Sequence, residues 1–305
     1  MKQKVPADKN KKYMAILLAV IMLFSVFMML FSGSDPTANS NSGNEASTPS
    51  AEKKSSTIPF SQIPGKQVHH QFNSIADGLN MSPEGVIFAE YVNIQNIKGT
   101  PLEQSYENTT ANLKQFYGAD VTKLYIANYA DGSEFELHAI PEQRILNNSF
   151  VPVPYHSYYL LSRGSSGDAW NVLGSPVVLG SRQTVKNVID VLEGNATSTT
   201  QYNGILNQTN PENVIIQEVA MKTNYTTEAV ADQYYMDLLK QDDGSYAQTS
   251  LFMNLKPDVA KNITALQTTS SERGVKYNIT SSGNITKLVI SSDFNSLLNE
   301  TRMLK

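Results

Sequence analysis

An uncharged apolar run near the start of the chain constrains its architecture more than any other feature. The run reads YMAILLAVIMLFSVFMMLF, from Tyr13 to Phe31. A helix rises about 1.5 Å per residue, so these 19 residues nearly span a hydrocarbon core about 30 Å thick. We therefore expect residues 13–31 to form a transmembrane helix. A cleaved signal peptide is the alternative, but its apolar region is usually only about 7–15 residues long, which favours an uncleaved signal anchor.

The charges on either side of this run predict its orientation. Residues 1–12 carry five lysines and one aspartate, a local charge of +4, and because the whole chain carries −4 the remainder carries −8. The first charge after the run is Asp35. Positive residues stay on the cytoplasmic side of a membrane helix. The prediction is a single-pass protein of the cell membrane with a cytoplasmic tail, residues 1–12, and an extracellular C-terminal part.

Composition excludes several classes of function. A mildly acidic body is a poor partner for nucleic acid, whose binding depends on clustered lysine and arginine. The chain has no cysteine, which excludes disulfides, thiolate nucleophiles, cysteine-ligated zinc and iron–sulfur clusters. No phosphate-loop or dinucleotide fingerprint occurs. We therefore predict no cofactor, no metal and no catalytic residue from motifs alone.

The segment after the membrane run is rich in serine, threonine, asparagine, glycine and proline. Residues 32–61 hold too little apolar surface to offset the entropy of ordering them, so we expect a flexible stalk. Beyond it the glycosylation sequon Asn-x-Ser/Thr recurs, which is typical of an exposed extracellular domain. The sequon asparagines are Asn108, Asn147, Asn195, Asn207, Asn224, Asn262, Asn278, Asn284 and Asn299.

The body of the chain contains an internal repeat. The segment FNSI at 72–75, followed by SPEGVIFAE at 82–90, recurs as YNGI at 202–205, followed by NPENVIIQE at 210–218. This divides the body into two related halves, 62–201 and 202–305. The sequence leaves open whether the halves form one continuous sheet or two small domains.

Local patterns predict the secondary structure of both halves. We expect helices at 103–117, 184–193, 228–240 and 257–268, and strands at 122–129, 134–140 and 246–255. Strands at 275–281 and 284–291 form a second hairpin, turned by Ser282-Gly283. Strands, tight turns and helices in this order indicate an α+β fold: mainly antiparallel sheet with helices on one face.

Few side chains qualify as site candidates. Glu90 and Glu218 occupy matching places in the repeat, where a buried carboxylate with a raised pKa is conceivable, although a structural role is the stronger interpretation. Arg163 and Trp170 flank a Gly/Ser loop and could contact a ligand or partner. The histidine pair His69-His70 is expected to be solvated, since neighbouring side chains on an extended chain point in opposite directions.

The layout as a whole resembles a known group of proteins. A lysine-rich tail, one anchor, a Ser/Thr/Asn stalk and a sequon-rich body, together with the unit GSPVVLGSRQTVKNVIDVLEG, resemble the uncharacterised exported or surface-anchored proteins of methanogenic archaea. The resemblance implies an extracytoplasmic setting and brings no catalytic residues.

Three functional hypotheses follow. The leading one is a non-enzymatic binding module that contacts an envelope component or another membrane protein. The second is a carboxylate-dependent hydrolase of an envelope polymer, which requires a cleft containing both Glu90 and Glu218. The third is a subunit of a membrane assembly or sensor, although residues 13–31 lack a Gly-x-x-x-Gly face for helix packing.

Overall fold

A computed structural model describes residues 56–303 apart from 148–149, 163–168, 210–211 and 224–228. The predicted membrane helix, residues 13–31, lies outside these residues. Within the described part of the chain, every helix is too short or too polar to cross a bilayer.

The elements of the first half run from residue 57 to residue 192. They are β1 Thr57–Pro59, η1 Phe60–Gln62, β2 Val68–His69, α2 Ile75–Met81, β3 Val86–Asn93, α3 Ile94–Ile97, α4 Glu103–Tyr117, β4 Lys123–Tyr129, β5 Glu134–Ala139, β6 Arg144–Leu146, β7 Val151–Tyr155, β8 Tyr158–Ser162, β9 Trp170–Val172, β10 Gly174–Ser175, β11 Val177–Gly180 and α5 Arg182–Leu192. The second half contributes α6 Asn203–Leu206, β12 Val214–Met221, β13 Gln233–Lys240, β14 Tyr246–Met253, α7 Pro257–Thr268, η2 Ser270–Arg273, β15 Lys276–Ser282, β16 Ile285–Ser292 and α8 Phe294–Met303.

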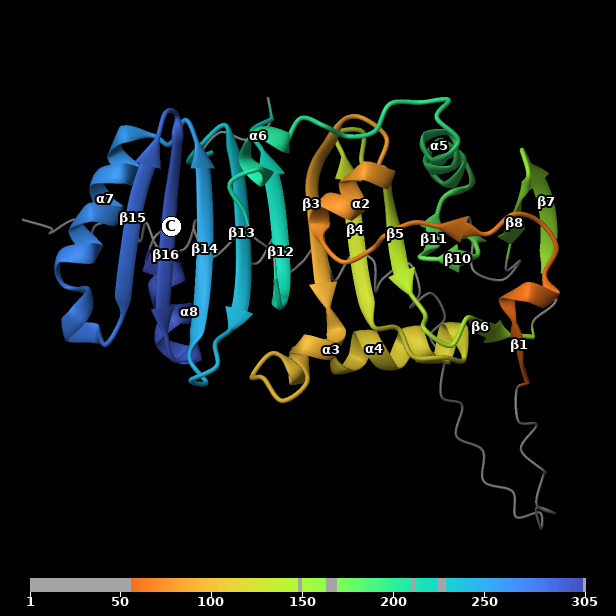
Figure 1. Ribbon diagram of the computed structural model, residues 1–305, viewed down its shortest axis with the longest axis horizontal. Coiled ribbons are helices and arrows are strands. Elements are labelled where there is room, and N and C mark those ends of the chain that lie inside the picture. Colours follow the sequence, from red (N-terminus) through yellow and green to blue (C-terminus); the bar gives the residue numbers. More distant parts are fainter. Residues whose placement is uncertain (1–55, 148–149, 163–168, 210–211, 224–228, 304–305) are drawn as a thin grey trace, which may run out of the picture. The chain divides into compact units, whose positions relative to one another are not determined.

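One long sheet joins the two halves of the repeat. Its twelve strands follow the order β15-β16-β14-β13-β12-β3-β4-β5-β11-β9-β8-β7, and neighbouring strands are antiparallel. Figure 1 shows the first half, orange to green, on one side and the second half, cyan to blue, on the other. The halves meet where β12 pairs with β3. The repeat therefore builds one continuous sheet.

Helices cover both faces of this sheet, so the prediction of helices on one face is wrong. Buried residues of α2, α5 and α6 belong to one apolar cluster with Tyr91 and Tyr125; we call this side the α2 face. Buried residues of α3, α4, α7 and α8 belong to a second cluster with Val92 and Leu124, on the α4 face. Successive residues of a strand point to opposite faces of the sheet. Here the side chains on both faces are apolar enough to need burial by helices.

The second half differs from the prediction at residues 228–240. The expected helix is absent, because β13 pairs along its whole length with β12 and β14. In the first half α4 lies between two neighbouring strands, β3 and β4, whereas the described residues between β12 and β13, 222–223 and 229–232, contain no helix. The strand was not predicted because Asp237, a charged residue, occupies a buried position in it. Asp237 is 4% exposed and accepts a hydrogen bond from the Tyr235 hydroxyl at 3.0 Å. A buried carboxylate breaks the alternation that predicts a half-buried strand.

The predicted stalk also ends earlier than expected. Residues Thr57–Pro59 form a strand that pairs with β6, and Phe60 is 1% exposed. The apolar side chains Ile58 and Phe60 bury enough surface to order this end of the Ser/Thr-rich segment.

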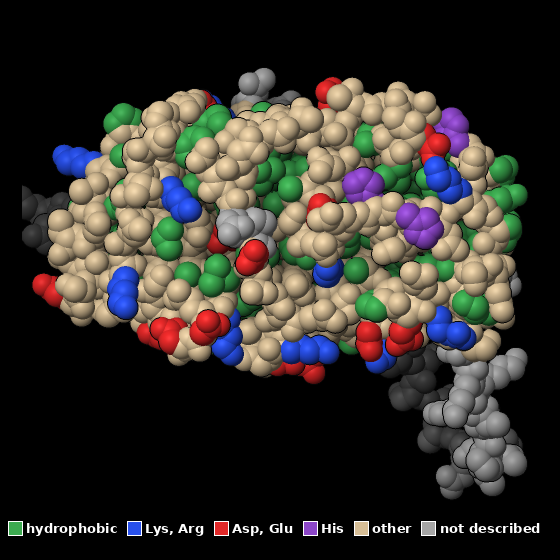
Figure 2. All heavy atoms as spheres, viewed as in Figure 1, with side chains coloured by type: hydrophobic (Ala, Val, Ile, Leu, Met, Phe, Trp, Pro, Cys, Tyr) green, Lys and Arg blue, Asp and Glu red, His purple; other side chains and the backbone are tan. Residues whose placement is uncertain are grey.

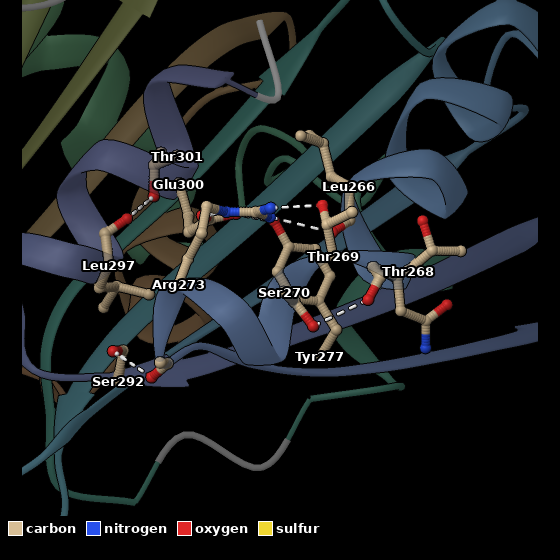
Figure 3. A network of polar contacts seen from close by, with 12 residues as sticks. Leu266, Thr268, Thr269, Ser270, Arg273, Tyr277, Ser292, Leu297, Glu300 and Thr301 are labelled. Carbon is tan, nitrogen blue, oxygen red and sulfur yellow. Dashed lines mark hydrogen bonds and ion pairs between the residues drawn. The ribbon is translucent and has the colours of Figure 1, made fainter.

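A buried ion pair fixes the C-terminal helix to the sheet (Figure 3). Glu300 on α8 is 1% exposed and accepts hydrogen bonds from the Arg273 guanidinium and, at 2.5 Å, from the Tyr277 hydroxyl. Burial alone would raise the pKa of Glu300, but the bonds from Arg273 and Tyr277 lower it below its ordinary value. The ion pair ties α8 to η2 and β15.

Candidate functional site

Two glutamates meet at the junction of the two halves. Glu90 on β3 and Glu218 on β12 are direct cross-strand partners in the antiparallel register. Side chains in such positions stand about 5 Å apart at their Cβ atoms and point to the same face, here the α4 face. Their matching places in the repeat bring them together, because the corresponding strands of the two halves pair with each other.

Helix α4 covers this carboxyl pair. Leu102, Tyr106, Leu113 and Tyr117 lie at helical spacing and form its sheet-facing stripe. The Tyr106 hydroxyl donates to Oε1 of Glu90 at 3.3 Å, and Glu90 is 6% exposed. The helix ends at Gly118, whose φ of 73° is a left-handed conformation that favours glycine.

Burial decides the charge state of the pair. Burial first, and then the neighbouring carboxylate of Glu218, raise the pKa of Glu90 to about 8. Burial and both carboxylates also raise the pKa of Tyr106 well above its ordinary value. At neutral pH the protonated form of Glu90 is therefore favoured.

A second polar cluster lies under the other end of α4. Tyr117 and Nδ1 of His138 are joined by a 2.7 Å hydrogen bond, and Nε2 of His138 lies 2.7 Å from Oε2 of Glu136. Ile126 on β4 pairs with Glu90 on β3 and with Glu136 on β5, so Glu136 lies two strands from Glu90 in the same row across the sheet. Glu136 and His138 lie two residues apart on β5, so their side chains share one face of the sheet.

A groove of about 870 Å³ runs beside the covered pair. It lies between α3, the first turns of α4 and the loops at the ends of β4 and β5, and Tyr106 forms part of its wall. Its charged lining residues are Glu103, Glu107, Asp120, Glu142 and Lys98. In Figure 2 charged side chains gather along the border of the molecule where Figure 1 shows α3 and α4. A groove of this size accommodates a small ligand or a peptide segment, and its net negative lining favours a cation.

The remaining candidates from the sequence lie apart from this groove. His69 and His70 are exposed, as expected for solvated histidines. Trp170 lies on β9, where the Arg182 guanidinium stacks 5.2 Å from its ring centre. Arg163 lies outside the described residues.

Sequon asparagines occupy the surface of the fold. Asn224 lies outside the described residues, and the others are all exposed. Asn278, which the sequence places inside a strand, is on β15 with its side chain exposed. The asparagine side chain is therefore accessible to solvent at each described position.

The described residues offer no metal centre. In this part of the chain, no group of three or more histidine, aspartate and glutamate side chains is arranged to hold a metal ion.

Comparison with known proteins gives a partial family match. A model of the AF_2048 family N-terminal domain matches residues 71–193, which is less than half of the chain. The matched segment contains Glu90, the carboxyl-covering helix α4 and the groove. No curated protein matches the chain.

Solved structures of TP0453 are distantly similar to the chain. Crystal forms III, I and IV have TM-scores of 0.46, 0.43 and 0.45 at 10%, 10% and 8% identity. They cover 73%, 75% and 72% of this chain and 97%, 97% and 95% of TP0453.

Proposed function

We propose that this chain is a membrane-anchored, extracytoplasmic binding module whose groove takes a cationic segment of an envelope or membrane protein. The acidic groove beside α3 and α4 carries this proposal. Four carboxylates and one lysine line it, and Asp120 is paired with Lys114 at 3.0 Å. The net charge of the lining is negative, which attracts a cation.

Sequence features support the membrane part of the proposal. Residues 13–31 are long and apolar enough to anchor the chain, and the lysines before them favour an extracellular body. The exposure of the described sequon asparagines is compatible with that setting.

Binding of a defined cation tests the groove. Octa-arginine is charged at every working pH, and its affinity for the purified full-length chain can be measured by calorimetry at low salt. Glu107 and Glu142 line the groove and are exposed, so Glu107→Gln and Glu142→Gln remove charge without disturbing the core. We expect each change to weaken binding by about 3- to 10-fold, the effect of one nearby charge in a largely hydrated site.

A matched control lies outside the groove. Glu272 on η2 is equally exposed, and Glu272→Gln removes the same charge far along the chain from α3 and α4. We expect this change to leave octa-arginine binding within about twofold of the parent protein. Equal losses from all three changes would show that net charge attracts the peptide, and the groove proposal would be abandoned.

A carboxylate-dependent hydrolase is the second candidate, and one observation favours it. Glu90 and Glu218 are direct neighbours with Glu90 protonated at neutral pH, as an acid–base pair requires. However, Glu90 is 6% exposed beneath Tyr106, which leaves a polymer no direct access. Turnover of an envelope polysaccharide that disappears in Glu90→Gln and Glu218→Gln would put this candidate first.

A further inference from the structure

Tyr106 contacts both the groove and the Glu90–Glu218 pair, in which Glu90 is buried and Glu218 is half-buried. Tyr106 lines the groove, and its hydroxyl donates to Glu90 at 3.3 Å. A cation held against the groove side of Tyr106 would therefore lie on the order of 10 Å from the Glu90 carboxyl, the length of a tyrosine side chain plus one contact. Unit charges at that distance still interact appreciably in a partly buried site.

The groups that face Glu90 determine how it responds to a nearby cation. Glu218 faces it from β12, and Tyr106 faces it from α4. On β4 its register partner is the apolar Ile126, and Glu136 follows one strand further. On the other side of Glu218, burial and then the Glu218 charge raise the pKa of Tyr234 on β13. These described neighbours are acidic or neutral, and an approaching cation favours ionisation of Glu90.

We propose that the Glu90–Glu218 pair is a proton-binding site coupled to the groove, and that it releases its proton when the groove takes a cationic ligand. The inference deepens the proposed function and rests on it. No bond to the ligand is needed: the O–H bond of one carboxyl breaks, the proton passes to solvent, and the resulting carboxylate faces Glu218 with its charge partly offset by the ligand cation.

The size of the effect follows from the separation of the charges. At about 10 Å and an effective dielectric constant of about 20, a unit cation lowers the pKa of Glu90 by about one unit. Starting from a pKa of about 8, the pair then releases roughly half a proton at pH 7.5. Linkage is reciprocal, so affinity for the cation rises about tenfold from pH 6 to pH 9.

The experiment measures proton release and affinity together. Octa-arginine is titrated into the full-length chain by calorimetry in two pH 7.5 buffers of different ionisation enthalpy, and affinity is measured from pH 6 to pH 9. The expected result is release of roughly half a proton and a tenfold rise in affinity. In Glu90→Gln both should disappear, while the affinity at pH 6 should stay close to that of the parent chain.

A second variant keeps the proposal testable if Glu90→Gln does not fold. Glu218→Gln removes the neighbouring charge, so Glu90 should titrate at a lower pH and the affinity rise should move down with it. A rise in affinity that persists in Glu90→Gln would assign the effect to other groups and overturn the inference. Tight binding with no proton release would overturn the inference alone. No octa-arginine binding at any pH would overturn the proposed function as well.

Discussion

Replacing Glu90 by glutamine should make the protein more stable at neutral pH. The pKa of Glu90 is about 8 in the folded protein, against an ordinary value of 4.5. A carboxyl whose folded pKa is raised favours the folded state fully below pH 4.5, and this advantage is lost as the pH rises to about 8. The 3.5-unit difference corresponds to about 5 kcal/mol in total, of which about 3 kcal/mol is already lost at pH 7.

Glutamine reproduces the shape of the protonated carboxyl and can still accept the Tyr106 hydroxyl. Glu90→Gln should therefore match the parent chain at pH 4.5 to within about 1 kcal/mol and exceed its unfolding free energy by about 3 kcal/mol at pH 7. Urea unfolding, followed by the fluorescence of the single tryptophan, Trp170, measures both values. Equal stability of the two proteins at pH 7, or a loss in Glu90→Gln, would refute the assignment of a buried, protonated carboxyl.

Three further outcomes are expected. Glu300→Gln removes the partner of Arg273 and should lower the unfolding free energy by about 3 kcal/mol at pH 7, measured by thermal unfolding. Because the pKa of Glu300 is lowered in the folded protein, the difference between variant and parent should shrink as the pH falls below about 4.5. A difference that stays constant with pH would argue against the ion pair. Gly78→Ala places a Cβ 2.4 Å from the Tyr125 ring and should destabilise the fold by about 1–3 kcal/mol, whereas an unchanged melting temperature would show that the ring moves aside freely. Deletion of residues 13–31 should release the chain from membranes in a carbonate-wash assay, and continued membrane association would remove the anchor.

Local structure was predictable wherever the pattern depended on neighbouring residues. The helices at Glu103–Tyr117 and Pro257–Thr268 have the predicted bounds, because an amphipathic stripe in the first and an N-terminal proline in the second define them locally. The side chain of Ser181 caps α5 by accepting from the Thr184 N–H at 3.1 Å, a contact between residues three apart in the sequence. Gly194 has the left-handed φ of 73° that fits the residue closing this helix.

Features that depend on distant residues were not predictable. Strand β13 lies between β12 and β14, and pairing with these two strands buries Asp237. The packing of helices on both faces of the sheet likewise depends on contacts between segments that are far apart in the sequence. Such tertiary contacts override local propensity.

The candidate site was predictable only in part. The repeat placed Glu90 and Glu218 at matching positions, and antiparallel pairing of the two repeat strands makes such positions neighbours. The sequence carried no sign of Tyr106 above Glu90 or of the groove, since α4 reaches both from a separate segment. Glu136 and His138 lie two residues apart on β5, but their link to Tyr117 also required the folded arrangement of α4.

Photo-cross-linking from the groove tests the central claim most directly. Gln104 lines the groove, and a photoreactive residue at this position reports contact with whatever enters it. The account predicts that octa-arginine cross-links there, that added salt suppresses the product, and that a photoreactive residue at exposed Glu272 gives little product. Equal cross-linking from both positions, or none from Gln104, would contradict the claim that the groove beside α4 receives a cationic partner.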